Sequence, residues 1–289
     1  MAVAGEVNQA IGRAYQLVFL AALEAHIKGF ENRFTVEKEP EKTSFVTRSG
    51  KSFSFDFCGV RNDEWRSREV FGESKGYTRA SDLLSAYKLF LAKAYVASTD
   101  YTRNRNDLFW FVTNVPFACN EGSRIRTVDF VKRTLNDASN QGVREILGEG
   151  HVDDMLAWAL TQNLGVFILT DSYLMNAELS YKVAYGDSLW SILKRFHAGS
   201  PPPTFGELAD RIAKNNGLES PDRIISGKRI QFRWLGIGLP PVSDVGDENQ
   251  CQPISHSAEQ VCYAGPQLEE STKQSATGFV DSDSDELTV

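Results

Sequence analysis

The sequence has few cysteines, no long apolar run and no leader-like N-terminus. Four Cys in 289 residues are too few for the disulfide framework that stabilises small secreted domains. No stretch reaches the roughly 18 consecutive apolar residues that a membrane-spanning helix needs. The first nine residues contain no basic segment followed by an apolar one, so no signal peptide is predicted. We therefore expect a cytoplasmic protein that has no membrane partner.

Positive charge is also scarce overall, but it is unevenly distributed along the chain. The formal net charge is −7, and residues 240–289 alone hold ten acidic residues and one Lys. That segment contributes −9, which leaves +2 for residues 1–239. Residues 181–234 carry nine Lys or Arg and five Asp or Glu, a local excess of +4. An acidic total therefore does not exclude a partner that is rich in phosphate.

The last fifty residues differ in composition from the rest of the chain. Aromatic residues nearly disappear after Leu239, and Ser, Gln, Asp and Glu dominate residues 240–289. Such a composition cannot bury enough apolar surface to order itself, so we expect a disordered acidic tail. Cys251, His256 and Cys262 within it resemble part of a metal knuckle, but a fourth ligand is missing and no metal site is expected there.

Residues 1–175 predict an α/β domain. Apolar spacing and capping residues, such as Ser81, predict helices at residues 7–29, 81–97, 127–136 and 153–164. Alternating or short apolar segments predict strands at residues 33–37, 44–48, 52–60, 69–76, 108–112 and 166–169. A helix, an antiparallel meander, a second helix and further apolar strands are typical of a mixed sheet covered by helices on both faces.

A charged cluster is expected on two neighbouring strands of this domain. Alternation along residues 52–57 predicts one strand face that carries Phe53, Phe55 and Phe57. Asp56 then points to the other face. Glu73 and Lys75 are two residues apart, so they share a face of the next strand. If the two strands pair as a hairpin around residues 61–68, two carboxylates and one ammonium group converge on one point of the sheet.

This set of groups suits the hydrolysis of phosphodiester bonds. Carboxylate oxygens hold Mg²⁺, which activates water and offsets negative charge, and a Lys stabilises or orients the nucleophile. The alternative is a solvated face with chance charges, because a Glu-x-Lys pair alone is common. The context favours the functional interpretation: an Asp in an apolar strand, Val-Phe-Gly-Glu-Ser-Lys in the next strand, and then a long helix.

These residues resemble the signature of the PD-(D/E)XK, or restriction-endonuclease-like, superfamily. The resemblance implies that Asp56, Glu73 and the carbonyl of Ser74 hold Mg²⁺ or Mn²⁺ and that Lys75 is the catalytic Lys. Phe55 stands where the signature has Pro. Many members also place a catalytic Glu on the preceding helix. Glu24 fits that position, and an ordinary exposed Glu is an equal alternative.

The resemblance covers roughly residues 7–171 and implies a reaction class more than a substrate. The segments Leu-Phe-Trp-Phe-Val-Thr-Asn (108–114) and Gly-Val-Phe-Ile-Leu-Thr-Asp (165–171) look like later core strands of the family. As the nucleic-acid partner of this chain we expect DNA more than RNA. Basic residues that could contact phosphates are Arg103, Arg105, Arg124, Arg126, Lys132 and Arg133.

Residues 179–236 predict a second, small domain with βααβ order. The run Tyr-Lys-Val-Ala-Tyr-Gly-Asp-Ser-Leu-Trp-Ser-Ile-Leu-Lys-Arg-Phe (181–196) resembles a LysM repeat. Gly186 permits the turn out of the strand, and Asp187 or Ser188 caps the helix. The resemblance implies binding of N-acetylglucosamine polymers between loops 186–188 and 225–227. The missing export signal and the long Pro-rich segment 197–208 argue instead for an intracellular protein partner or self-association.

The sequence thus predicts three parts: a nuclease-like domain (1–175), a LysM-like domain (179–236) and an acidic tail (240–289). The expected function is a Mg²⁺-dependent endonuclease, in phage defence or as a toxin effector, with LysM as a docking module. The rival is a non-enzymatic LysM adaptor of a phage-tail-like or injection system that carries a degenerate nuclease fold. An exported cell-wall hydrolase ranks last, because it needs a non-standard export route.

Truncation after Leu239 tests the expectation for the tail. We expect an unchanged thermal unfolding midpoint and tighter non-specific binding to nucleic acid, because the removed segment carries −9 and competes with phosphates. Calorimetry and fluorescence anisotropy with labelled DNA measure the two effects. A midpoint lowered by several degrees would show that the tail belongs to the folded structure.

Overall fold

The structure is a computed structural model that describes residues 2–47, 50–76, 82–100, 106–118, 122, 124–148, 151–196 and 205–234. The expected tail at 240–289, with Cys251, His256 and Cys262, lies outside the described residues. So do Ser81, Arg103 and Arg105. Among the described residues, no helix is long and apolar enough to cross a membrane.

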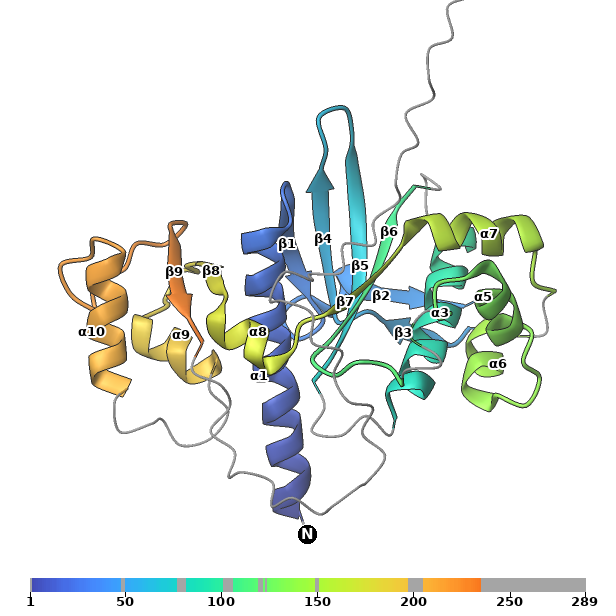
Figure 1. Ribbon diagram of the computed structural model, residues 1–289, viewed down its shortest axis with the longest axis horizontal. Helices are drawn as coiled ribbons and strands as arrows, with labels where there is room; N and C mark the ends of the chain where they lie inside the picture. The colour runs from blue at the N-terminus through green and yellow to red at the C-terminus, as the bar shows by residue number, and fades with distance from the viewer. Residues whose placement is uncertain are drawn as a thin grey trace, which may run out of the picture.

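Five strands form a mixed sheet in the order β1-β4-β5-β6-β7 (Figure 1). They are β1 (Phe30–Thr35), β4 (Phe57–Asn62), β5 (Ser67–Lys75), β6 (Leu108–Thr113) and β7 (Leu164–Ile168). β4 pairs antiparallel with both β1 and β5, whereas β6 pairs parallel with both β5 and β7. Every residue of β6 is buried, as a central strand covered on both faces requires. The prediction of a mixed sheet flanked by helices is confirmed.

Two apolar cores lie on the two faces of this sheet. Alternate residues of β6 divide between them: Trp110 and Val112 join the core that contains α1 (Ala2–His26), and Phe109 and Phe111 join the other. The second core lies under a group of helices, which are α3 (Leu83–Asp100), α5 (Val128–Leu135), α6 (Gln141–Leu147) and α7 (Asp154–Asn163). Thr127 and Asp153 cap α5 and α7 by accepting hydrogen bonds from main-chain amides of the first turn.

The strand expected at residues 52–60 is broken in the structure. β3 (Ser52–Ser54) pairs only with β2 (Ser44–Val46), a strand that follows the short helix α2 (Pro40–Thr43). At the break, the Phe55 amide donates to the Thr43 carbonyl at 3.0 Å and the Asp56 carbonyl accepts from the Val36 amide at 3.0 Å. These bonds to an earlier segment replace the sheet ladder and change the direction of the chain.

The break corrects the expectation that three Phe share one face. Phe53 and Phe55 belong to the core beneath α3, whereas Phe57 belongs to the core that contains α1. Simple alternation fails here because it assumes one continuous strand. Asp56 nevertheless lies at the edge of the sheet, because it directly precedes Phe57, the first residue of β4, which pairs with Gly72 of β5.

Residues 18–23 of helix α1 are buried on all sides. The six consecutive residues Val18, Phe19, Leu20, Ala21, Ala22 and Leu23 are each at most 5% exposed. A helix that covers a sheet with one face keeps polar residues on the opposite face, so burial of a complete turn requires a second packing partner. The sheet supplies one partner, and the C-terminal unit supplies the other.

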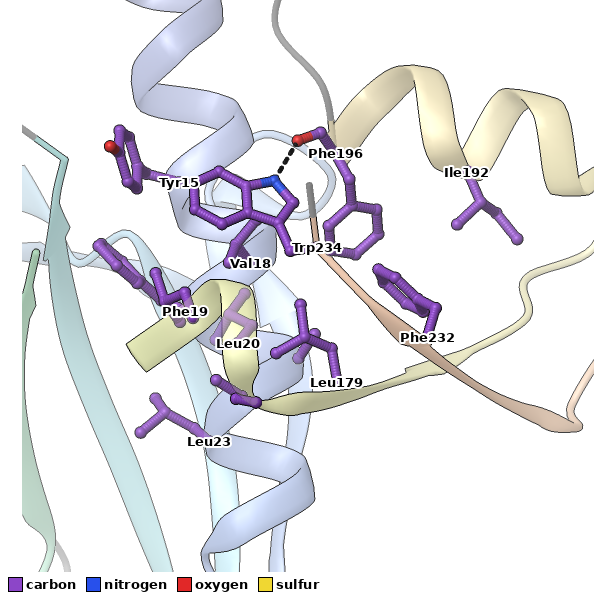
Figure 2. Close-up of a cluster of buried hydrophobic side chains, with 14 of the residues drawn as sticks. Tyr15, Val18, Phe19, Leu20, Leu23, Leu179, Ile192, Phe196, Phe232 and Trp234 are labelled. Atoms are coloured by element: carbon purple, nitrogen blue, oxygen red, sulfur yellow. Dashed lines mark hydrogen bonds between the residues drawn. The ribbon is translucent and has the colours of Figure 1, made fainter. Parts of the chain in front are cut away.

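The C-terminal unit has the expected βααβ order. Its elements are β8 (Glu178–Lys182), α9 (Leu189–Phe196), α10 (Phe205–Asn215) and β9 (Arg229–Arg233), and the short helix α8 (Asp171–Asn176) leads into it. β8 and β9 pair antiparallel, with Tyr181 opposite Ile230. Leu179, Ile192 and Phe196 belong to the same continuous core as α1 (Figure 2).

Aromatic and ionic contacts close the seam between the two units. The Trp234 ring lies 5.7 Å from the Tyr15 ring of α1, and its Nε1 donates to the Phe196 carbonyl at 3.0 Å (Figure 2). Arg229 pairs with Glu24 at 2.7 Å, and Lys182 pairs with Glu31 at 3.0 Å. The described parts of the two units therefore share one apolar core.

A shared core predicts that the two units unfold together. Replacing the buried Trp234 by Ala should cost about 3–5 kcal/mol and lower one common transition. Differential scanning calorimetry of the full chain should show a single peak for both the natural and the variant protein. Two resolved peaks, of which only one moves in the variant, would mean that the seam contributes little.

Candidate active site

The register of the β4–β5 hairpin places Asp56 beside Glu73. Phe57 pairs with Gly72, and the ladder continues to Asn62 opposite Ser67. Asp56 directly precedes Phe57, and Glu73 directly follows Gly72, so the two acidic residues are neighbours across the strands. The structure thus brings Asp56, Glu73 and Lys75 together, and we refer to them as the carboxylate cluster.

Asp56 is held by both its side chain and its main chain. Its Oδ2 accepts hydrogen bonds from the Ser74 amide at 2.8 Å and the Ser74 hydroxyl at 3.2 Å. Lys75 Nζ lies 3.5 Å from the same oxygen. The main-chain carbonyl accepts from Gln16 Nε2 of α1 at 2.8 Å. These bonds fix the carboxylate at the break between β3 and β4.

Glu73 is almost fully buried and bound by two ammonium groups. Only 3% of the residue is exposed. Its Oε2 lies 2.8 Å from Lys75 Nζ, while its Oε1 contacts Lys93 Nζ of α3. Lys93 also donates to the Ser54 carbonyl at 3.0 Å. Two negative and two positive groups therefore meet at one place, and Lys75 bridges both carboxylates.

The two carboxylates repel each other despite this pairing. Burial raises the pKa of Asp56 above its ordinary value, and the charge of Glu73 raises it further. Lys75, the Ser74 amide and Lys93 lower it, in that order, but do not reverse the direction of the shift. A divalent metal cation between the carboxylates would relieve this repulsion.

The donor set fits a small, oxygen-preferring cation. Mg²⁺ in proteins is commonly held by one or two carboxylates, with water and substrate phosphate completing its shell. Asp56 and Glu73 supply those two carboxylates, and no Cys or His of the described ranges forms a metal-binding group with them. No group of three or more His, Cys, Asp or Glu gathers anywhere in the described ranges. Because Lys75 now contacts both carboxylates, an ion bound there would require its ammonium group to move.

Glu24 is not part of the carboxylate cluster, contrary to the expected catalytic role. Its Oε1 accepts from the Asn32 amide at 2.9 Å, and its Oε2 pairs with Arg229 of β9. It lies eight residues, or about 12 Å, along α1 from Gln16, which is the residue of that helix that contacts Asp56. Ser74 contacts Asp56 through its amide and hydroxyl, and the role of its carbonyl as a ligand stays a prediction.

The sequence-based reasoning missed Lys93 and Gln16. A signal for Lys93 exists, because it is the sole charged residue between Leu89 and Ala97 in an otherwise apolar helix. A buried ammonium group needs a carboxylate partner, so such a Lys indicates an acidic residue opposite. Gln16 has no comparable signal, since a Gln in a helix is ordinary and its partner is forty residues away.

Part of the expected basic surface is present. Arg124, Lys132 and Arg133 line a surface hollow of about 640 Å³ at the start of α5, together with Thr127 and Asp129. Lys132 pairs with Asp154 at 2.9 Å, which offsets one of the positive charges. The remaining charge leaves a modestly basic surface on the side of the sheet that carries α3.

The two loops expected to hold a LysM ligand adjoin the paired ends of β8 and β9, where Lys182 lies opposite Arg229. Gly186 and Gly227 have φ angles of +80° and +83°, which glycine adopts at little cost. The Gly227 amide donates to the Val183 carbonyl at 2.8 Å. Asp187 accepts from the Ala184 amide at 2.8 Å and pairs with Arg195 at 2.5 Å. The second loop borders a hollow of about 520 Å³ that includes Arg223 and Lys228.

Comparison with known proteins identifies the smaller unit. Residues 181–233 match the family model of the LysM domain. The chain therefore contains a LysM domain, as the resemblance implied, and this class of domain is a binding module. Neither the curated proteins nor the solved structures include a match to this chain.

The double ion pairing of Glu73 predicts a specific response to Lys93→Met. Loss of its ammonium group leaves a buried carboxylate underpaired, which costs about 3–5 kcal/mol of folding free energy. Mg²⁺ or Mn²⁺ should restore more stability to this variant than to the natural protein, because the ion replaces the missing charge. Thermal unfolding with and without the ion measures the difference.

Lys88→Met is the matched control for that experiment, because Lys88 lies on the same helix, whereas the ion pairs of Glu73 are with Lys75 and Lys93. It should unfold near the natural midpoint with no added response to the ion. Equal responses of all three proteins to the ion would mean that Glu73 does not bind it.

Proposed function

We propose that the chain is a metal-dependent phosphodiester hydrolase that acts on DNA. The observation that carries the proposal is the convergence of Asp56, Glu73 and Lys75 at the end of β5 in a mixed sheet. Their identity and spacing also resemble the PD-(D/E)XK signature. In cells such an activity fits phage defence or a toxin effector.

Each residue of the carboxylate cluster has a role in this proposal. Asp56 and Glu73 hold the Mg²⁺ or Mn²⁺ ion, which would activate water and offset charge on the scissile phosphate. Lys75 lies next to both carboxylates and stabilises the negative charge that develops on the phosphate. Lys93 pairs with Glu73 and orients it from the side of α3. The Ser74 amide keeps Asp56 Oδ2 in place.

The charge distribution supports a phosphate-rich substrate. Arg124, Lys132 and Arg133 provide positive charge at α5, in the helical layer on the side of the sheet that carries α3. The LysM domain adds a local excess of +4. Contacts of this kind neutralise backbone phosphates without reading sequence, so salt should weaken binding strongly.

A non-enzymatic adaptor is the second candidate. Lys75 and Lys93 together match the charge of both carboxylates, so the cluster can serve as a structural ion-pair network alone. The LysM domain also shares a core with the larger domain, which suits a rigid binding unit. In this case the nuclease-like fold is degenerate and LysM binds a protein partner or a second copy of the chain.

A cleavage assay separates the two candidates. Purified full-length protein should nick plasmid DNA with Mg²⁺ or Mn²⁺ but not with Ca²⁺. Asp56→Asn, Glu73→Gln and Lys75→Met should each lower the rate about 100-fold or more, because each removes a charged group from the reaction centre. Single-stranded DNA and RNA substrates measured in parallel define the preference.

Glu69→Gln is the matched control, since Glu69 lies on the same strand but four residues from Glu73. It should retain the natural rate. If Lys75→Met cleaves as fast as the natural protein, the assigned site is wrong. If the natural protein cleaves no substrate with any of these ions, the adaptor function is favoured.

A further inference from the structure

The first helix connects the LysM domain to the carboxylate cluster through two adjacent side chains. Tyr15 and Gln16 follow each other on α1, and both are buried, with 4% and 9% of each residue exposed. Gln16 reaches the sheet at Asp56, whereas Tyr15 contacts the LysM domain and the end of β5. Adjacent residues in an α-helix have a fixed relative position, so a displacement of the helix at Tyr15 also displaces Gln16.

Gln16 holds the main chain of Asp56 at the one point where the strand is interrupted. The Asp56 carbonyl has two donors, the Val36 amide at 3.0 Å and Gln16 Nε2 at 2.8 Å. Within β4 proper, ladder bonds fix each residue, but Asp56 lies just outside β4. A buried amide side chain that lost this partner would carry an unsatisfied donor, which costs about 1–3 kcal/mol.

Tyr15 fixes the chain directly after Lys75. Gly76 packs flat on the Tyr15 side chain, and a Cβ at Gly76 would lie 2.3 Å from Tyr15 Cδ2. The Tyr15 hydroxyl donates to Asp171 at 2.9 Å, and Asn114 Nδ2 lies 3.3 Å from the same carboxylate. Burial, followed by the charge of Asp171, raises the pKa of Tyr15, so the hydroxyl remains a donor.

Trp234 of the LysM segment packs on the same tyrosine. Its ring meets Tyr15 edge-on at 5.7 Å and an interplanar angle of 61° (Figure 2). It is 2% exposed and its Nε1 is bound to the Phe196 carbonyl. The LysM core therefore determines the position of Trp234, and Trp234 limits the position of Tyr15.

We propose that Gln16 and Tyr15 are positioning residues of the carboxylate cluster and that the LysM domain sets their place through Trp234. The expected effect on the position of Asp56 is independent of the proposed function. The expected effect on catalysis rests on the proposed function and deepens it. LysM in this chain is then a structural part of the site as well as a binding module. Loss of the Gln16 hydrogen bond should increase the mobility of Asp56. Replacement of Trp234 by a smaller residue should have the same effect indirectly, through Tyr15 and Gln16.

The amide of Ser74 reports on this directly, because it donates to Asp56 Oδ2. Hydrogen exchange of the full-length protein measures its protection without any need for nuclease activity. Gln16→Met keeps the length of the side chain but removes the donor, and exchange at Ser74 should rise about five- to tenfold. Gln16→Lys keeps a nitrogen donor on an unbranched chain and should restore most of the protection.

Two matched controls separate positioning from a general loss of stability. Gln9→Met makes the same change at an exposed site of the same helix. Ile212→Val trims the LysM core on α10, which packs on α9 and β9, and is compared with Trp234→Phe at the seam. Trp234→Phe should raise Ser74 exchange about two- to fivefold, whereas both controls leave it unchanged.

Unchanged Ser74 exchange in both Gln16→Met and Trp234→Phe would overturn the inference. Equal increases in the controls would also overturn it, because they would reflect global loosening. If the proposed nuclease activity is present, both variants should lower kcat with little change in KM. If that activity is absent while Ser74 exchange follows the expected pattern, the proposed function fails and the positioning role stands.

Discussion

The burial of α1 on all sides is the constraint on which the rest of the structure depends. A complete turn of this helix, Val18–Leu23, has no exposed face, so both the sheet and the LysM domain must pack against it. Removal of either partner would expose a large apolar surface to water. The described parts of the chain therefore form one folded unit with two lobes, and the LysM domain is not an independent domain joined by a linker.

That constraint extends to the carboxylate cluster. The same helix supplies Gln16 to the Asp56 carbonyl and Tyr15 to the surface of Gly76. On the opposite face of the sheet, α3 supplies Lys93 to Glu73. The cluster is therefore held from both faces of the sheet, and its two carboxylates remain close although their charges repel.

Much of the fold and part of the site followed from the sequence because they depend on local pattern. Helical and strand periodicity predicted most of the elements, and the assumed hairpin around residues 61–68 has the register that places Asp56 beside Glu73. The order of the LysM elements was also predictable, since Gly186 and the apolar face of α9 are local features. The apolar run Val18–Leu23 is likewise visible in the sequence, but the helix prediction for residues 7–29 did not name the two surfaces that bury it.

Other features depend on distant partners, and local pattern cannot supply them. The break at Phe55 and Asp56 is made by Thr43 and Val36, so alternation placed Phe57 on the wrong face. Glu24 was assigned to the site by its position on the helix, but Arg229, more than two hundred residues away, holds it at the seam. The partner of Lys93 becomes evident only when α3 packs on β5.

A crystal of the full-length protein grown with Mn²⁺ tests the central claim most directly, because anomalous scattering locates the ion independently of any assay. The account predicts an anomalous peak bound by the carboxylates of Asp56 and Glu73, with Lys75 displaced from its position between them and Lys93 still in contact with Glu73. A crystal at millimolar Mn²⁺ with no peak there, and with Lys75 still bridging the two carboxylates, would contradict it.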